Sequence, residues 1–333
     1  MAEIVLALGS SHSPMLGSPA EDYSAHAAID RGETNWKRTL LDKSGRPTSY
    51  EKLLEQAPPN IEEQLTLKVV KERAERCRNC IDHLSIVLAD GNLDALIVVG
   101  DDQLEQFHED NMPAILIYWG ETILNNVLTL AEDSPEFWRR ARSIYHEESV
   151  PREYPVASGL SRHLIGQLVD SGFDVSHSRR LPRERGEGHA FGFVHRQLMR
   201  DRIIPILPIA MNTYFSPNQP RPQRCYALGR AIHAAVNSWD GDQRIGILAS
   251  GGLSHFTINE ELDRKVLEAC RNKDRETLVS LSPNVLSSGS SEIRNWITVA
   301  GAAEQLDMSW SEYVSCYRSA AGTGTGMGFA VWS

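Results

Sequence analysis

Residues 4–14 read IVLALGSSHSP, an apolar run that opens into a turn of small residues carrying His12. A strand that ends in such a turn presents a side chain at the edge of its sheet, where open α/β proteins build their ligand sites. A single histidine at this place could equally be a capping or core residue. The stretch predicts an α/β fold and offers one candidate functional residue.

Two later stretches repeat this arrangement. Residues 244–255 read RIGILASGGLSH, a second short β-type run whose Gly/Ser turn ends in His255. A third run, residues 96–99, opens into GDDQLEQFH at residues 100–108. If these three strands are parallel neighbours, their polar ends converge on one cleft.

Composition limits the classes of function. The chain has 333 residues, of which 41% are hydrophobic and 23% charged, as in soluble globular proteins. A net charge of −10 without a basic block argues against nucleic acid or an anionic membrane surface as a partner. The sequence shows no apolar stretch of about 18 residues and no basic, apolar leader. Together with five scattered cysteines, this predicts a cytoplasmic protein.

Spacing along the chain predicts one domain over residues 1–333, with a central mixed sheet flanked by helices and the site at the strand ends. Apolar periodicity predicts helices over residues 61–89 and 223–238, and residues 120–155 are expected to be helical. The run AAGTGTGMG at residues 320–328 is expected to be a loop before a last strand at 329–332. It matches neither a phosphate-binding loop nor a dinucleotide fingerprint, but its glycines would let backbone approach a ligand.

A carboxylate candidate completes a possible metal site. Two histidines and one carboxylate on one face of a metal leave positions open for substrate and oxygen, as in non-haem Fe(II) oxygenases. His12 and His255 supply imidazoles, and Glu292 follows the small-residue stretch at 287–291, which predicts a helix start. An acid in a first turn could instead simply complement the helix dipole.

Four motifs in register resemble the class III extradiol ring-cleavage dioxygenases, over nearly the whole chain. They are SHSP at 11–14, GDDQ at 100–103 with DNMP at 110–113, GGLSH at 251–255, and SEIRNW at 291–296. The resemblance is to the catalytic chain of protocatechuate 4,5-dioxygenase and to the single-chain gallate and 3-O-methylgallate dioxygenases. It implies Fe(II), O2 and a catecholic, carboxylated aromatic substrate whose ring is opened in aromatic catabolism. It also implies a homodimer or a related partner subunit.

The same resemblance assigns roles to residues. It places iron on His12, on the neighbourhood of Gln103 and on Glu292. It makes His255 the acid/base group and His189 a further histidine that contacts substrate. By the same analogy the C-terminal glycine loop, with Thr323, Gly324 and Thr325, lies over the substrate carboxylate.

The chain departs from the family at the second iron ligand, where relatives carry a histidine at or beside position 103. Gln103 offers only a neutral carbonyl oxygen, which is a weaker donor than imidazole. If residues 103–108 are helical, His108 could turn toward the same face. The loop before His189 differs as well, and its arginine cluster, with Arg185, either attracts a substrate carboxylate or forms a solvated face.

These departures leave three hypotheses about the function of the chain. One is an iron-dependent extradiol dioxygenase, which the joint presence of His12, Glu292 and His255 favours. Another is a relative that keeps the fold but serves as a non-catalytic partner subunit or binding protein. The third is an enzyme of metal-independent acid/base chemistry that uses His12 and His255.

Overall fold

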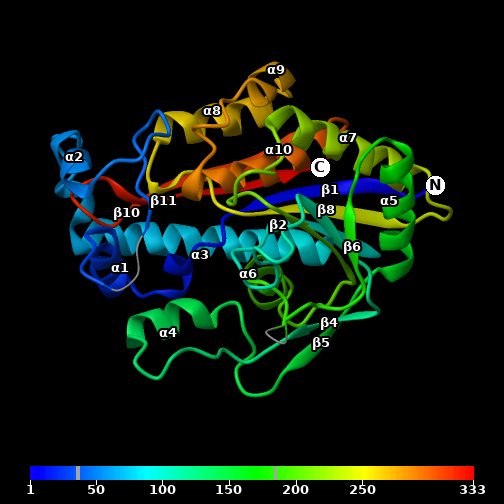
Figure 1. The fold of residues 1–333 in the computed structure, drawn as a ribbon, viewed down its shortest axis with the longest axis horizontal. Helices are drawn as coiled ribbons and strands as arrows, with labels where there is room; N and C mark the ends of the chain where they lie inside the picture. The colour runs from blue at the N-terminus through cyan, green and yellow to red at the C-terminus, as the bar shows by residue number, and fades with distance from the viewer. Residues whose placement is uncertain (35–37, 184–185) are drawn as a thin grey trace.

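A nine-stranded mixed β-sheet forms the centre of the computed structural model, and helices cover it (Figure 1). The structure describes residues 1–34, 38–183 and 186–333. In their order across the sheet, the strands are β10 (Met308–Tyr317), β11 (Thr323–Trp332), β1 (Glu3–Ser10), β8 (Arg244–Ser250), β2 (Ala95–Asp101), β7 (Ile206–Met211), β3 (Ile115–Tyr118) and β6 (Ser176–Ser178). β9 (His255–Thr257) pairs with β11 beside this path.

The three strands singled out by their polar ends are parallel neighbours. β1 pairs with β8, and β8 pairs with β2, both in parallel. Because parallel strands that run side by side end at the same edge of a sheet, the turns after Ser10, Ser250 and Asp101 meet there. The predicted α/β class, mixed sheet and position of the strand ends are confirmed.

Hydrophobic cores lie on both faces of the sheet. In β2, Ile97 and Val99 join the core on one face, while Leu96 and Val98 join the core on the other. This alternation explains why the strands are continuous apolar runs, since both faces are covered. α7 and α10 pack on the first face and α3 on the second.

The described helices and the remaining strands surround this sheet. The helices are α1 (Tyr23–Asp30), α2 (Tyr50–Glu55), α3 (Leu67–Asp90), α4 (Glu136–Ser143), α5 (Ser158–Asp170), α6 (His189–Phe193), α7 (Pro222–Asn237), α8 (Glu260–Arg271), α9 (Arg275–Val279) and α10 (Ile293–Ala302). β4 (Thr122–Asn125) and β5 (Arg152–Pro155) form a separate two-stranded sheet. Among the described helices, none has both the length and the apolar content needed to cross a bilayer.

Two local predictions were wrong, and the condition under which His108 could share a face with Gln103 is not met. Residues 120–155 contain two strands, β4 and β5, as well as the helix α4, and the two strands pair with each other in an antiparallel ladder. Residues 103–108 are not helical, since Leu104 has a φ of 60°, which a right-handed helix excludes. The glycine run is mostly strand, because β11 begins at Thr323 and pairs along its length with β10. The extent of the domain stays a prediction.

The glycines of β11 make room for a buried carboxylate. Asp263 of α8 accepts hydrogen bonds from the backbone N–H of Ser254 (2.7 Å), from its hydroxyl (2.6 Å) and from Tyr313 (2.8 Å). Gly326 lies directly against this carboxylate. Since Ser254 precedes His255, the close packing at Gly326 helps to fix the turn that carries this histidine.

Replacing Gly326 with alanine tests this packing. The added Cβ would lie 2.0 Å from Oδ2 of Asp263, so we expect the free energy of unfolding to fall by about 1–3 kcal/mol. Gly166→Ala is the matched control, because a Cβ in this part of α5 meets nothing within 4 Å and should stabilise by up to about 1 kcal/mol. Urea denaturation compares the two variants. Equal effects would contradict the proposed close packing.

Candidate functional site

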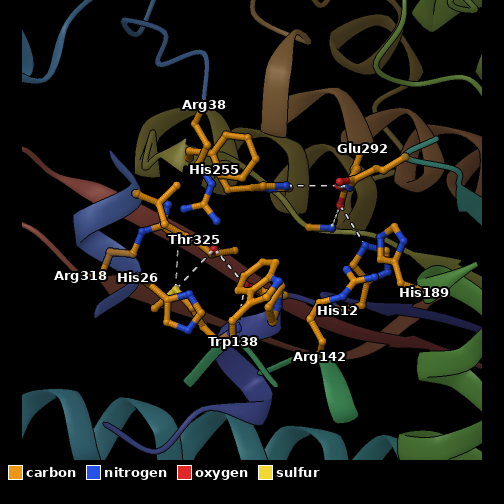
Figure 2. Close-up of a pocket in the computed structure, with 17 residues that line it drawn as sticks. His12, His26, Arg38, Trp138, Arg142, His189, His255, Glu292, Arg318 and Thr325 are labelled. Carbon is orange, nitrogen blue, oxygen red and sulfur yellow. Dashed lines mark hydrogen bonds and ion pairs between the residues drawn. The ribbon is translucent and has the colours of Figure 1, made fainter. Parts of the chain in front are cut away.

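The converging strand ends form one wall of a cavity of about 260 Å³ (Figure 2). Ser10 of β1 lies beside Ser250 of β8 in the parallel register, and β2 ends at Asp101 on the other side of β8. Side chains from turns, loops and the helices α1, α4 and α6 complete the wall, and His12, His189, His255 and Glu292 all line the cavity. The site therefore depends on contacts between segments that are far apart in the sequence.

His12 has a fixed ring orientation. Its Nδ1 lies 3.0 Å from the hydroxyl of Ser250, and that hydroxyl donates its own proton to the carbonyl of Ala190 (2.7 Å). The Ser250 oxygen must therefore accept a hydrogen bond from Nδ1–H of His12. The ring carries its proton on Nδ1, so the lone pair of Nε2 faces the cavity. This Nε2 is buried without a hydrogen-bond partner among the described residues. It lies 3.3 Å from Glu292 Oε2 and 3.8 Å from Asp101 Oδ1.

His189 is held in the same way by a carboxylate. Its Nδ1 lies 2.7 Å from Oε2 of Glu105, which also accepts from the His189 backbone N–H (3.1 Å). Burial opposes ionisation of Glu105, but His189 and Arg142 hold its pKa well below the usual range. The carboxylate therefore accepts a hydrogen bond from Nδ1–H, and Nε2 of His189 points toward Asp101, with 3.9 Å between Nε2 and Oδ2.

Asp101 lies between the two imidazoles. Its carboxylate is fully buried, and Oδ1 has no hydrogen-bond partner among the described residues. Burial and the nearby Glu292 carboxylate raise its pKa well above the usual range. Single ligand atoms of His12, Asp101 and His189 lie within 4.8 Å of one another. Two of these groups, Nε2 of His12 and Oδ1 of Asp101, are buried without a hydrogen-bond partner among the described residues. Together with the His189 imidazole they fit a cation, whose positive charge would offset that of the carboxylate.

Glu292 lies at the end of the short 3-10 turn before α10 and receives several donors. Its Oε2 accepts from the backbone N–H of Gly252 (2.6 Å), and its Oε1 accepts from Tyr214 (2.7 Å) and from the amide of Gln103 (3.2 Å). Burial alone would raise the pKa of this carboxyl, but the imidazoles of His255 and His12 hold it well below the usual range. Glu292 is therefore an anion in contact with the cluster.

His255 is arranged to exchange a proton. Its Nδ1 donates to the carbonyl of Leu253 (2.9 Å), so Nε2 is left to face the cavity. This Nε2 lies 3.1 Å from the hydroxyl of Tyr214 and 3.2 Å from Oε1 of Glu292. A ring with one nitrogen fixed by the backbone and the other beside a carboxylate can take up and return a proton.

Gly251 and Gly252 allow this crowding. A Cβ on Gly252 would lie 2.8 Å from the ring of His255, and one on Gly251 would lie 2.9 Å from the side chain of Asn295. Only residues without side chains let the turn after β8 approach both His255 and Glu292 so closely.

Comparison with known proteins identifies a family to which the sequence is similar. The model for the catalytic LigB subunit of aromatic ring-opening dioxygenases matches residues 88–328. The chain belongs to this family. The resemblance of the sequence motifs to class III extradiol dioxygenases is thereby confirmed.

Individual relatives are more distant. A gallate dioxygenase from Pseudomonas putida is 30% identical over 166 residues, which cover 45% of this chain and 48% of that enzyme. A 2,3-dihydroxyphenylpropionate/2,3-dihydroxicinnamic acid 1,2-dioxygenase from Photorhabdus laumondii is 25% identical over 258 residues, or 75% of this chain and 69% of that enzyme. The first match thus spans about half the length of the relative, 48%.

Of the site residues predicted from the sequence, some line this cavity and others do not. His12, Gln103, His189, His255, Glu292 and Thr325 all line the cavity. His108 does not, and Thr323 lies behind the wall, where its hydroxyl donates to Asp30 (2.7 Å). Gly324 pairs with Phe256 between β11 and β9. Arg185 lies outside the described residues.

Sequence reasoning missed Asp101, Glu105, Tyr214 and Arg38. Asp101 and Gln103 are two residues apart at the end of a strand, so alternation along β2 was a usable signal for Asp101. The other three contact the site through loops whose paths depend on long-range packing. Sequence reasoning also gave His189 a role with substrate, whereas the structure places its Nε2 beside Asp101.

Glu105 can be tested as the group that orients His189. Glu105→Gln removes the charge under the imidazole, so we expect affinity for a divalent metal such as Fe(II) to fall about 10- to 100-fold in a folded protein. Glu109→Gln, the same substitution at an exposed position four residues later, should leave the affinity unchanged. Anaerobic calorimetry measures both. Unaltered metal affinity in the Glu105 variant would refute this role.

Proposed function

We propose that this chain is a non-haem Fe(II)-dependent extradiol dioxygenase that opens the ring of a catecholic, carboxylated aromatic compound with O2. The observation that carries the proposal is the buried cluster of His12 Nε2, His189 Nε2 and the Asp101 carboxylate beside Glu292. Family membership supports the reaction class. The relatives' printed names, which refer to gallate and 2,3-dihydroxyphenylpropionate, support a carboxylated aromatic diol or triol as substrate.

His12, His189 and Asp101 would hold the metal. Two imidazoles and one carboxylate make the donor set of non-haem Fe(II) oxygenases, and His189 would supply the imidazole that Gln103 does not. Bound Fe(II) would bring catecholate and O2 together and let electron density pass between them. Gln103, whose amide donates toward Asp101 (3.3 Å) and Glu292 (3.2 Å), would orient the two carboxylates.

The remaining side chains bind the substrate and move its proton. Nε2 of His255 would take a proton from a substrate hydroxyl, because its other nitrogen is already bonded to the backbone. The hydroxyl of Tyr214 lies 3.1 Å from this nitrogen but donates its hydrogen bond to Glu292 (2.7 Å), so the lone pair of Nε2 stays available to a substrate hydroxyl. Met15, Trp138 and Phe256 give the cavity apolar walls that suit an aromatic ring and exclude water.

Metal binding is the first expected outcome. An anaerobic Fe(II) titration followed by calorimetry should show about one equivalent bound to the wild-type chain. His12→Ala, His189→Ala and Asp101→Asn should each weaken binding strongly, since each removes a donor of the cluster. His108→Ala is the matched control and should bind like wild type, because His108 does not line the cavity.

Two results of this titration would contradict the proposal. Failure of folded wild-type protein to bind Fe(II) would favour a non-catalytic partner subunit or metal-free acid/base chemistry. Loss of binding in the His108 variant with retention in the His189 variant would move the second imidazole to His108.

The role of His255 predicts a separate effect on turnover. His255→Gln should keep Fe(II) affinity near that of wild type, while kcat for oxygen uptake with gallate or 2,3-dihydroxyphenylpropionate falls about 10²- to 10⁴-fold. His163→Gln, at a histidine that bonds to the carbonyl of Ala235 (3.0 Å), should leave kcat unchanged. An oxygen-electrode assay gives both values. Turnover near wild type in the His255 variant would exclude it as the proton acceptor.

A further inference from the structure

The far end of the cavity contains two guanidinium groups around one carboxylate. Arg318 donates to Asp30 through Nε (2.6 Å, to Oδ2) and Nη2 (2.9 Å, to Oδ1). Arg38 donates to the same carboxylate through Nη1 (2.9 Å), and Thr323 donates through its hydroxyl (2.7 Å). Four hydrogen bonds therefore occupy Asp30, which has no lone pair left for a further donor.

The two arginines and Asp30 together carry a net positive charge, because one carboxylate is shared by two guanidinium groups. Arg318 and Asp30 are 3% and 0% exposed at their side chains, and Arg38 is 13% exposed. In the described part of the chain, Asp30 is the only carboxylate that pairs with either arginine. Burial, together with Arg318 and Arg38, lowers the pKa of the neighbouring His26 to about 3, so this imidazole is neutral.

The repulsion acts on Arg38 itself. Burial and the charge of Arg318 lower the pKa of Arg38 to about 10, although Asp30 opposes the shift. A buried cation without its own counter-ion is costly, and an anion that enters the cavity relieves that cost.

These residues belong to the same cavity as the metal-capable cluster. Figure 2 shows Arg38, Arg318 and His26 toward one end and His12 with His189 at the other. Phe256 lies under the Arg38 guanidinium at 4.6 Å and presents an aromatic surface next to it. A molecule bound at the cluster can therefore extend along an apolar wall to Arg38.

We propose that Arg38 binds a carboxylate that the substrate carries at the end remote from its diol. This rests on the proposed function for the diol end of the cavity. Arg318 is a positioning residue, because its Nε and Nη2 are committed to Asp30 and its Nη1 lies against the sulfur of Met15 (3.5 Å). Arg38 commits Nη1 to Asp30, and with respect to the described residues the rest of its planar fork is available for two parallel hydrogen bonds to a carboxylate.

Two arginines of the loop before His189 are directed elsewhere. Arg183 forms a two-point pair with Asp110 at 2.8 and 2.6 Å, and Arg179 lies over the ring of Trp119. Neither lines the cavity. Arg142 does line it, but its charge is matched by Glu105 at 3.2 Å.

The test is anaerobic calorimetry of the Fe(II)-loaded protein with two probes of one shape, 3-(2,3-dihydroxyphenyl)propanoate and its carboxamide. Wild type should bind the carboxylate at least about tenfold more tightly than the amide, the size of one charge-assisted hydrogen bond. Arg38→Gln should remove this preference by weakening carboxylate binding and leaving amide binding unchanged. Arg46→Gln, at an exposed arginine paired with Asp42, is the control and should keep the preference.

Arg38→Lys keeps the proposal testable if the glutamine variant does not fold, as checked by circular dichroism. Lysine keeps the charge but not the planar fork, so the preference should fall several-fold. Equal binding of both probes by wild type, or a full preference in either Arg38 variant, would overturn the assignment. Oxygen uptake separates the two proposals: an Arg38-dependent preference without ring opening refutes the proposed function alone, and ring opening without the preference refutes this inference alone.

Discussion

The site depends on the burial of two carboxylates, Asp101 and Glu292, which lie 3.8 and 3.3 Å from the same nitrogen, Nε2 of His12. Their pKa values move apart: burial and the Glu292 charge raise that of Asp101, whereas the imidazoles of His255 and His12 overcome burial to lower that of Glu292. Two buried acids beside a nitrogen lone pair are unfavourable unless positive charge lies among them. Hydrogen bonds from the backbone of Gly252 and from the side chains of Tyr214 and Gln103 hold the Glu292 carboxylate in this position.

That arrangement follows from the order of strands in the sheet. β8 lies between β1 and β2 and runs parallel to both, so His12, Gly252 and Asp101 are brought together by one edge. β9 then pairs with β11 and places His255 opposite Thr325. The turn between β8 and β9 is fixed by Asp263, whose carboxyl has a pKa raised to about 6 by burial, opposed by hydrogen bonds from Ser254. Packing distant from the cavity thus sets where the imidazole of His255 lies.

How much of this could be predicted from sequence differs by residue. His12 and His255 were accessible because a strand followed by a small-residue turn has a known exit direction, and parallel pairing of their strands was a reasonable assumption. The strand that contains the C-terminal glycines was not, because β11 depends on pairing with β10 and on room for Asp263, neither of which leaves a local pattern. Arg38 gave no local signal either, since its place comes from Asp30 on α1 and from Arg318 after β10.

The charges along the cavity also decide which way an anionic aromatic can enter. At one end the Glu292 carboxylate already accepts hydrogen bonds from Gly252, Tyr214 and Gln103, and Arg142 is paired with Glu105, so among the described residues no unpaired arginine lies there. At the other end the described residues leave the charge of Arg38 unmatched, since Asp30 is shared with Arg318. Under the proposed function, a reversed substrate would therefore lose both its ion pair with Arg38 and the contact of its diol with the metal-capable cluster. In this proposal orientation is selected by attraction at the Arg38 end, so that the diol is directed toward the end of the cavity where His255 is fixed by its hydrogen bond to Leu253.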